Sequence, residues 1–571
     1  MRIKKVTIRN FRAIKEAEVY FTDLTALIGE NNSGKSSFLK ALNAFFNYSD
    51  EKKSFQAGEH RYRSRTRPVV QIEFELLRRN AEFENYMSSN NTMEILVKFS
   101  NDPRKSVREV KYLNRTNSFE SIKRPEDFFK VLEKHYKFIV IPVNRTGDEL
   151  DKFIQKISGD YLDKITKNRD RISSKMNAVV ESIDVRLNHI SKMIEEGYPL
   201  GREFELIIKM PRLNYKVLLD KLDISLKEKD KAYSVHDSGT GIQSLLAVSI
   251  YTHIAKEIGV NVLFAIEEPE TNLHPQAQIK FIKSLKKMEE NNQIILTTHS
   301  PTMVDQLTHL DIVLFRKLHE SKNIETKVTQ VSRDFWEKTG LEEQRTMKFY
   351  RYKNSDFFFA KKIVVVESSI DGEVVEFILN NAAGVSNDDL AILDLGGIKS
   401  LKYPVYLFKE LDLPFVTIVD KDFFVYYSDN DNKKNLSRGE DGFFRYRYDR
   451  FNSSSQEIID ILIPDTNIQK LLLNLLREGH HKKVLQLLSD YNIVVMRYCL
   501  EMDLLSTKKG IEKMYDILEI EEHSGNRNSK YVLNNKQKAT KDFKNIMQIL
   551  QNMERRNYPL SFSKIISLVK K

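Results

Sequence analysis

The sequence predicts an α/β protein of two or three domains, and two groups of motifs carry that prediction. In the first half, an apolar strand runs into the stretch GENNSGKS and then into a helix. In the second half, apolar strands alternate with helices, and acidic residues follow two of these strands. A chain of 571 residues is too long for one hydrophobic core, so each half is expected to fold around its own sheet.

The composition is that of a globular protein with an excess of positive charge. The 91 Lys and Arg outnumber the 80 Asp and Glu, for a formal charge of +11. This charge favours a polyanionic partner, but a lysine-rich composition without such a meaning accounts for it equally well. No apolar run reaches the roughly 18 to 20 residues that a membrane span needs. The only cysteine, Cys499, excludes an intramolecular disulfide framework and a cysteine-based zinc site, so a cytoplasmic setting is expected.

The stretch TALIGENNSGKSSFLKAL has the G-x-x-x-x-G-K-[ST] pattern of a phosphate-binding loop, between an apolar strand and a helix. Backbone N–H groups of such a loop wrap the phosphates, Lys35 would reach the β and γ oxygens, and Ser36 would ligate Mg²⁺. The alternative is an ordinary glycine-rich turn. The predicted ATP-binding residues are Gly29, Asn31, Asn32, Ser33, Gly34, Lys35, Ser36 and Ser37.

Two further strands end in residues suited to ATP hydrolysis. In VNVLFAIEEPETNLHP, Glu267 stands where P-loop ATPases hold Mg²⁺, and Glu268 where they polarise the attacking water. In QIILTTHSP, His299 follows a strand and is placed to sense the γ-phosphate, although a lone histidine there is often structural. Gln71 is a candidate Mg²⁺-sensing glutamine, with an outward-facing strand residue as the alternative.

The segment HDSGTGIQSLLAVSIY is a Ser-Gly-x-Gly turn before an apolar helix. Its Asp237 or Ser238 could simply cap that helix. In this order of motifs it resembles the signature segment of ABC-type ATPases, and with the opening VTIRNFRAIKE the set resembles their RecF/SMC branch. The resemblance implies that Ser238 and Gly239 contact the nucleotide bound by a second subunit, although this signature departs from the usual Leu-Ser-Gly-Gly form.

The domain order follows from these motifs. Residues 148–198 have no proline and place apolar residues at three- and four-residue steps, which predicts an amphipathic helical insertion suited to dimerisation or a solvated charged face. The ATPase domain is therefore expected in two parts, residues 1–147 and 199–345, followed by a second α/β domain over residues 346–571.

The second domain opens with a β-α-β-α-β pattern. Its first strand ends in Glu367, LAILDLGGIKSL gives a strand with a Gly-Gly turn, and FVTIVDKDFF ends in Asp420 and Asp422. Ligands bind at the carboxyl ends of parallel strands, and three convergent carboxylates form an oxygen-only site suited to Mg²⁺ or Mn²⁺. An exposed turn is the alternative for the D-x-D pair.

A glutamate after the first strand and a later D-x-D resemble the Toprim fold, whose acids hold divalent metal ions for phosphodiester chemistry. The resemblance implies that Asp371 is the second acid of the first motif, although Ser368 replaces the usual glycine. For a later acid, Glu501 and Asp503 are favoured over Glu457. The expected late lysine is Lys541, with Lys538 as the alternative, and plain surface residues explain these late positions equally well.

An ABC-type ATPase followed by a Toprim domain resembles the OLD (overcoming lysogenization defect) family nucleases, to which the Gabija-type defence nuclease belongs. The resemblance implies an ATP- and Mg²⁺- or Mn²⁺-dependent DNA endonuclease acting against phages, as a homodimer or higher homo-oligomer. Implied companions are a UvrD-like helicase or a retron reverse transcriptase with its RNA–DNA hybrid. The alternative is a DNA-binding ATPase whose Toprim domain only docks a partner.

Overall fold

The computed structural model divides into two compact units, residues 1–307 with 311–328, and residues 308–310 with 329–571. The division falls after Val328, whereas the predicted boundary at residue 345 stays a prediction. The structure describes residues 1–60, 62, 66–77, 80–100, 108–141, 169–197, 225–228, 231–234, 246, 249, 260–271, 273–287, 292–320, 323–342, 355–382, 390–428, 438–520 and 527–570.

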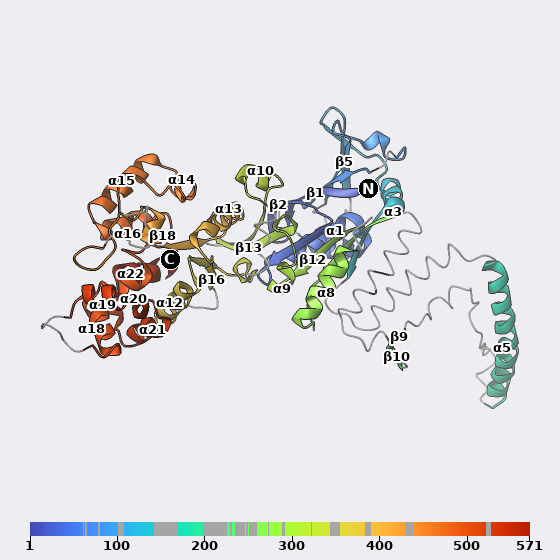
Figure 1. The fold of residues 1–571 in the computed structure, drawn as a ribbon. Helices are drawn as coiled ribbons and strands as arrows, with labels where there is room; N and C mark the ends of the chain where they lie inside the picture. The colour runs from blue at the N-terminus through green and yellow to red at the C-terminus, as the bar shows by residue number, and fades with distance from the viewer. Residues whose placement is uncertain are drawn as a thin grey trace. The chain divides into compact units, whose positions relative to one another are not determined.

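The first unit contains a six-stranded antiparallel sheet in the order β2-β1-β4-β5-β6-β7 (Figure 1). Its strand β4, with the sequence VVQIEFE, alternates buried and half-buried residues, as a strand with one face toward the core does. The strands are β1 Arg2–Phe11, β2 Ile14–Tyr20, β4 Val69–Glu75, β5 Thr92–Phe99, β6 Arg108–Leu113 and β7 Phe119–Ser121.

A second six-stranded sheet in this unit has the order β14-β13-β3-β12-β11-β8 and carries the nucleotide motifs. Strands β13, β3, β12, β11 and β8 are parallel, so their carboxyl ends share one edge. Strands β3 and β12 are buried along their whole length, which explains their continuous apolar sequences. The strands are β3 Leu24–Gly29, β8 Tyr136–Ile141, β11 Asn261–Glu267, β12 Asn292–Thr298, β13 Ile312–Glu320 and β14 Asn323–Gln330.

Helices flank this sheet, and α1 packs against β3 and β8 (Figure 1). Within the predicted insertion, residues 169–197 form one continuous helix, α5, whereas its role in dimerisation stays a prediction. The rest of the predicted insertion, residues 148–168 and 198, lies outside the described residues. The helices are α1 Lys35–Phe46, α2 Tyr48–Ala57, α3 Pro125–His135, α5 Arg169–Gly197, α8 Pro275–Lys286 and α9 Pro301–Val304, and a small β9–β10 ribbon joins Ser225–Glu228 to Lys231–Ser234.

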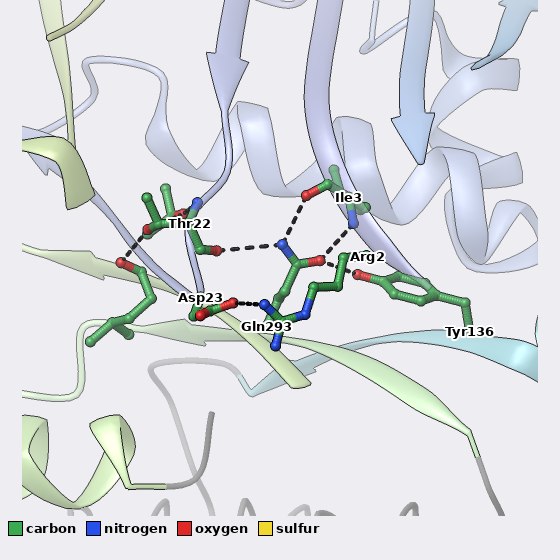
Figure 2. A network of polar contacts seen from close by, with 8 residues as sticks. Arg2, Ile3, Thr22, Asp23, Tyr136 and Gln293 are labelled. Atoms are coloured by element: carbon green, nitrogen blue, oxygen red, sulfur yellow. Dashed lines mark hydrogen bonds and ion pairs between the residues drawn. The ribbon is translucent and has the colours of Figure 1, made fainter. Parts of the chain in front are cut away.

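The side chain of Gln293 on β12 joins the two sheets of the first unit (Figure 2). Its Oε1 atom accepts the Ile3 amide at 2.7 Å and the Tyr136 hydroxyl at 3.0 Å, and its Nε2 atom donates to the Ile3 carbonyl at 2.8 Å. The Arg2 guanidinium pairs with Asp23 beside this network. One buried side-chain amide therefore satisfies the N–H and C=O groups of Ile3, near the start of β1, and joins this strand to the parallel sheet.

The second unit is built on a four-stranded parallel sheet in the order β16-β15-β17-β18. The predicted strand–helix alternation is present, because β15, β16 and β17 are separated by α12 and α13 (Figure 1). Helices α12 and α22 pack against each other and against the sheet. The strands are β15 Lys362–Val366, β16 Leu390–Asp394, β17 Phe415–Val419 and β18 Ile493–Val495.

The remaining helices of this unit follow β17. They are short and amphipathic, and their buried faces carry leucine, isoleucine and valine. The helices of the unit are α10 Phe335–Thr339, α12 Ser369–Asn380, α13 Lys402–Glu410, η8 Lys421–Phe423, α14 Gln456–Leu462, α15 Thr466–Arg477, α16 His481–Ser489, α17 Leu500–Leu505, α18 Lys508–Ile517, α19 Ser529–Asn535, α20 Gln537–Thr540, α21 Phe543–Gln551 and α22 Leu560–Lys570.

Residues 308–310 belong to the second unit because His309 is buried there among aromatic rings. Its ring centroid lies 4.7 Å from that of Phe335 and 4.5 Å from that of Trp336. Its Nδ1 atom lies 3.3 Å from the Tyr403 hydroxyl. Burial lowers the pKa of His309 to about 4.

Within the part of the chain that the structure describes, no helix combines the length and the apolar character needed to cross a bilayer.

Candidate functional site

The predicted phosphate-binding loop joins β3 to α1 through backbone conformations that favour glycine. Gly29 has φ +133°, and a Cβ atom there would lie 1.9 Å from the Phe315 carbonyl oxygen. Gly34 caps α1 with φ +111°, and its Cβ would lie 2.6 Å from Thr326 Oγ1. Both positions exclude a side chain, because the loop packs directly against neighbouring strands.

The Lys35 ammonium group lies inside this loop and bonds to its backbone. Its Nζ atom donates to the carbonyls of Gly29 at 2.9 Å and Glu30 at 2.8 Å. Burial lowers the pKa of Lys35 to about 8, against the opposing influence of the nearby carboxylates, first that of Glu268. A poorly solvated cation gains strongly from a phosphate, so the position suits the role predicted for it.

The other loop residues are arranged around this lysine. Asn31, Asn32 and Ser36 are exposed, Ser37 is half-buried, and Ser33 is buried. The Ser33 hydroxyl has no hydrogen-bond partner within the described ranges. The loop thus offers polar groups toward solvent, and one buried hydroxyl that a bound nucleotide could satisfy.

The ends of β11 and β12 bring Glu268 and His299 to the same edge. Glu267 pairs in register with Thr297, and Thr298 pairs with Ile28, so both ends meet the start of the loop. His299 Nε2 lies 3.3 Å from Glu268 Oε1. Burial and the charge of Lys35 lower the pKa of His299, whereas Glu268 raises it. The structure therefore brings Lys35, Glu268 and His299 together as the sequence predicted.

Glu267 closes β11 as a half-buried residue, and the backbone then turns sharply at Glu268, which has φ +41°. The Glu268 amide donates to the Thr297 carbonyl at 3.0 Å, which holds this turn against β12. A non-glycine residue in the left-handed region is uncommon for a glutamate, and strained backbone of this kind clusters at active sites.

Glu270 is a residue of this site that the sequence analysis did not single out. Its Oε1 atom accepts the His299 amide at 2.6 Å, and burial raises its pKa. Its Oε2 atom is buried and has no hydrogen-bond partner among the described residues. The signal was present in the sequence, because Glu270 is the third acid of the motif EEPETNLHP.

Gln71 lies in the antiparallel sheet, where its side chain donates to Glu94 on the neighbouring strand β5. This placement supports the alternative interpretation, in which Gln71 is an outward-facing strand residue and does not sense Mg²⁺. Asp237, Ser238 and Gly239, the candidate signature residues, lie outside the described residues.

The acids of the second unit collect at the carboxyl ends of adjacent parallel strands. Glu367 directly follows β15, and Asp420 and Asp422 follow β17, which pairs with β15. The Gly397 amide donates to the Glu367 carbonyl at 2.9 Å, in a turn where Gly396 and Gly397 have φ +63° and +125°. The predicted Gly-Gly turn thus holds the end of β16 beside the glutamate.

These carboxylates shift one another's pKa upward. Burial, then Asp422 and Asp371, raise the pKa of Glu367 to about 7. Burial and the carboxylates of Asp371, Asp422, Glu367 and Glu501 raise the pKa of Asp420 well above its usual range. Like charges held this close are stable only when protonated or neutralised by a cation. We call the five residues Glu367, Asp371, Asp420, Asp422 and Glu501 the acid cluster.

The donor chemistry of the acid cluster fits a hard divalent cation. All its side-chain donors are carboxylate oxygens, which Mg²⁺ and Mn²⁺ prefer. Among the residues that the structure describes, no three His, Cys, Asp or Glu side chains are already close enough to hold a metal ion. Carboxylates that are not neutralised repel one another, and a bound cation would offset that repulsion.

Two members of the cluster have additional contacts. Asp371 forms a capping box at the start of α12, where its Oδ2 atom accepts the Ser368 amide at 3.0 Å and hydroxyl at 2.8 Å. The S-x-x-D spacing is a sequence signal for this capping box. Burial raises the pKa of Asp422, and the nearby Tyr427 hydroxyl opposes that rise; Tyr427 was not among the residues predicted from the sequence.

The structure distinguishes among the candidate acids and lysines of the C-terminal part of this unit. Lys541 Nζ lies 3.3 Å from Glu501 Oε1, so both join the acid cluster. Burial lowers the pKa of Lys541, but the carboxylate of Glu501 and others outweigh it and raise the pKa. Glu457 instead pairs with Lys402 at 2.7 Å, and Lys538 is an exposed side chain.

Asp503 is not brought to the acid cluster, although it stands two residues after Glu501. Its carboxylate is buried and accepts three hydrogen bonds, from the Arg497 and Tyr498 amides at 2.8 and 2.9 Å and the Ser561 hydroxyl at 2.7 Å. Residues i and i+2 of a helix face different directions, so α17 cannot present both acids to one ion. Asp503 stabilises the chain between β18 and α22 instead of ligating metal.

Comparison with known proteins matches both units. The AAA ATPase domain family matches residues 1–154 and 114–304, which together span more than half of the chain. The TOPRIM domain of overcoming lysogenization defect protein-like proteins matches residues 358–422, a range that contains Glu367, Asp371, Asp420 and Asp422.

Two curated proteins align with most of the chain. The OLD nuclease of Thermus scotoductus is 23% identical over 459 residues, covering 74% of this chain and 82% of the relative. Endonuclease GajA of Bacillus cereus strain HuB5-5 is 21% identical over 509 residues, covering 73% of each. The solved SMC head domain from Thermotoga maritima aligns at 16% identity with a TM-score of 0.33, over 58% of this chain and 100% of its own. The chain belongs to the AAA ATPase domain family through its first half, and its second half contains a segment similar to the TOPRIM domain of overcoming lysogenization defect protein-like proteins.

Proposed function

We propose that this chain is an ATP-hydrolysing, divalent-metal-dependent DNA endonuclease. The observation that carries the proposal is the acid cluster, whose carboxylates lie at the carboxyl ends of β15 and β17 and raise one another's pKa. Such a site is unfavourable until a cation binds. Two similar proteins, an OLD nuclease and endonuclease GajA, are named for nuclease activity.

The residues divide the cleavage chemistry among them. Bound Mg²⁺ or Mn²⁺ would supply an activated water and stabilise the leaving oxygen of the phosphodiester. Glu367, Asp420 and Asp422 would hold the ions, with Asp371 and Glu501 at the edge of the site. Lys541, paired with Glu501 at 3.3 Å, is placed to balance the negative charge that develops on the phosphate.

In the first unit, the proposed chemistry is ATP hydrolysis. Lys35 and the loop amides would hold the phosphates, Ser36 and Glu267 the Mg²⁺, and Glu268 would orient the attacking water. His299, whose Nε2 atom lies 3.3 Å from Glu268 Oε1, would respond to the γ-phosphate. In this proposal the nucleotide gates DNA cleavage, and a homodimer or larger homo-oligomer is the acting form.

The direct test is cleavage of supercoiled plasmid by the purified full chain, with Mg²⁺ or Mn²⁺ and with or without ATP. We expect the wild-type chain to nick or linearise the plasmid, and Asp420→Asn and Asp422→Asn to lose cleavage while retaining ATP binding. Asp449→Asn is the matched control, because Asp449 is an exposed aspartate of the same unit that pairs with Arg450.

Two results would contradict the proposal. Wild-type-like cleavage by Asp420→Asn would show that the acid cluster is not the nuclease site. Absence of cleavage by the wild-type chain on any DNA or RNA, with either metal, would favour the alternative of a DNA-binding ATPase whose TOPRIM domain docks a partner.

We further propose a role in defence against phages, which the resemblance to the Gabija-type nuclease supports. A helicase of the UvrD type, or a reverse transcriptase with its RNA–DNA hybrid, is the proposed companion. Plaque counts on cells expressing the chain with its neighbouring genes test this role. We expect protection with the wild-type chain and none with Asp422→Asn, and equal plaque counts for both would contradict it.

A further inference from the structure

A second polar pocket lies in the TOPRIM unit, beside the residue between the two aspartates of the D-x-D motif. The pocket has a volume of about 300 Å³, and Lys421 is one of its lining residues. The other lining groups come from the segment before α14, from the end of α15 and start of α16, and from the segment after β18. No residue of the acid cluster lines this pocket.

The floor of the pocket is a cation surrounded by aromatic rings. Lys421 Nζ lies 4.9 Å from the ring centroid of Tyr446, 5.2 Å from that of Tyr448 and 5.9 Å from that of Tyr498. Tyr446 is 7% exposed, whereas Tyr448 and Tyr498 are half-buried and present part of their rings to the cavity. The site therefore combines a positive charge with flat apolar surfaces.

The mouth of the pocket adds further positive charge. Arg445, Arg477 and Arg497 line it and are exposed. The one carboxylate among the lining residues is Glu478, which lies 3.4 Å from His480. Cations gathered around one cavity repel each other, and an anionic ligand removes that repulsion.

His481 supplies a second, independent observation at this pocket. It lines the pocket at the start of α16, and its Nε2 atom is buried without a hydrogen-bond partner in the described part of the chain. Burial and the charges of Lys421 and Arg497 lower the pKa of His481 to about 4, so the ring is neutral near pH 7. A neutral imidazole N–H can donate to a phosphate oxygen.

We propose that this pocket binds a nucleotide, with its phosphate between Lys421, Arg497 and His481 and its base on Tyr448 or Tyr498. The cavity is at the small end of ligand sites, which suits one nucleotide rather than a longer segment. Stacking on tyrosine together with basic side chains is the chemistry by which proteins hold single nucleotides of a strand. The ligand is a free nucleotide or the terminal nucleotide of a DNA strand, and the second source rests on the proposed endonuclease function.

The pocket is connected to the acid cluster through two tyrosines. Tyr446, under Lys421, stacks on Tyr427 with ring centroids 5.1 Å apart. Tyr427 in turn lies close enough to Asp422 to lower the pKa of that carboxyl group, against the larger effect of burial, which raises it. A nucleotide in the pocket would therefore be connected to the acid cluster through Tyr446 and Tyr427, and could anchor one end of a strand.

The test is binding to the full-length chain carrying Lys35→Ala, which removes the nucleotide site of the first unit, in metal-free buffer that prevents cleavage. Isothermal titration calorimetry is run with deoxyadenosine 5′-monophosphate, with deoxyadenosine, and with a short single strand bearing a 5′-phosphate or a 5′-hydroxyl. The pocket variants are Arg497→Gln and Tyr448→Leu. Arg450→Gln is the matched control, because Arg450 is exposed, close to Tyr448 in sequence and absent from the pocket lining.

We expect binding that requires the phosphate. Loss of the Arg497 guanidinium should weaken it about tenfold, and loss of the Tyr448 ring about fivefold or more. Arg450→Gln should bind as the parent does. Binding of the monophosphate identifies a free nucleotide as the ligand, and binding of the 5′-phosphorylated strand alone identifies a strand end.

The proposal is overturned if neither phosphorylated ligand binds, or if binding is the same in the Arg497→Gln and Tyr448→Leu variants as in the parent. Thermal unfolding of each variant checks that the chain remains folded. Because binding is measured without metal, its failure leaves the plasmid-cleavage result, and so the proposed function, unaffected.

Discussion

His299 Nε2 lies 3.3 Å from Glu268 Oε1, at the ends of two adjacent parallel strands. Lys35 acts on the same pair, because its charge lowers the pKa of His299 while Glu268 raises the pKa of Lys35. A negative charge that binds near Lys35 therefore changes the electrostatic interaction between His299 and Glu268. This relationship connects phosphate binding to the residue proposed to orient water.

Glu268→Gln should abolish ATP hydrolysis without abolishing ATP binding. The amide keeps the shape of the side chain but cannot accept a proton from water, so we expect hydrolysis to fall by about 100-fold or more. Phosphate release and nucleotide binding measure the two effects separately. Glu16→Gln, an exposed substitution that removes a pair with Arg9, is the control. Undiminished phosphate release by Glu268→Gln would exclude this role.

Lys541→Ala should lower DNA cleavage while leaving ATP hydrolysis unchanged. The ammonium group stands 3.3 Å from Glu501 in the acid cluster, and removal of one group that balances transition-state charge costs about 100-fold. Cleavage rates at saturating metal make the measurement. Lys538→Ala removes an exposed lysine three residues away and should cleave like the wild-type chain. Equal losses in the two variants would refute a specific role for Lys541.

Asp420→Asn should stabilise the metal-free chain at pH 8 and remove its stabilisation by metal. Carboxylates whose pKa is raised by folding destabilise the folded state once pH rises above their unfolded values, so the repulsion is greatest at alkaline pH. We expect an unfolding temperature higher by about 2 °C or more in EDTA. Added Mg²⁺ should raise that temperature for the wild-type chain only. A lower value for the variant in EDTA would contradict the repulsive cluster.

Gln293→Leu should destabilise the first unit. The substitution leaves the Ile3 amide and carbonyl and the Tyr136 hydroxyl buried without their shared partner (Figure 2). Unsatisfied buried polar groups of this kind cost about 3 kcal/mol in total. Urea unfolding followed by circular dichroism measures the change. The control is Gln276→Leu, an exposed glutamine on α8, and an equally small effect of both substitutions would show that the network contributes little.

His309 should make the second unit less stable as the solution becomes acidic, against the opposite effect of the acid cluster, whose protonation removes repulsion. Its pKa is about 4 in the folded chain and about 6.5 when unfolded, so the unfolded state binds more protons between these values. The contribution of His309 to stability is therefore full above pH 6.5 and declines toward pH 4, by up to about 3 kcal/mol. His309→Phe should change the difference between the urea midpoints at pH 7.5 and pH 5, by raising the pH 5 midpoint relative to the pH 7.5 midpoint. An unchanged difference would exclude His309 as the titrating group.

The nucleotide site could be predicted from the sequence because the residues that form its loop lie close together in the chain. Gly29, Gly34 and Lys35 lie within one loop, and their spacing alone fixes the turn into α1. The acids at Glu268 and Glu367 were readable for a related reason. Each directly follows a buried apolar strand, and parallel strands end at one edge of a sheet.

Some roles depend on contacts between distant segments of the chain, and these could be assigned only from the structure. Glu501 and Asp503 share one short helix and similar sequence surroundings, yet only Glu501 meets Lys541, while Asp503 is held by Arg497, Tyr498 and Ser561. The same holds for the pocket beside Lys421, whose arginines and tyrosines come from separate segments.

The sequence by itself therefore determined the two domain types, the phosphate-binding loop and the acids that end the parallel strands, because local patterns specify them. Only the tertiary structure decided which late acid joins the cluster and which cations surround the nucleotide pocket. Helix orientation and long-range packing fix those choices, and neither is written in the spacing of residues along the chain.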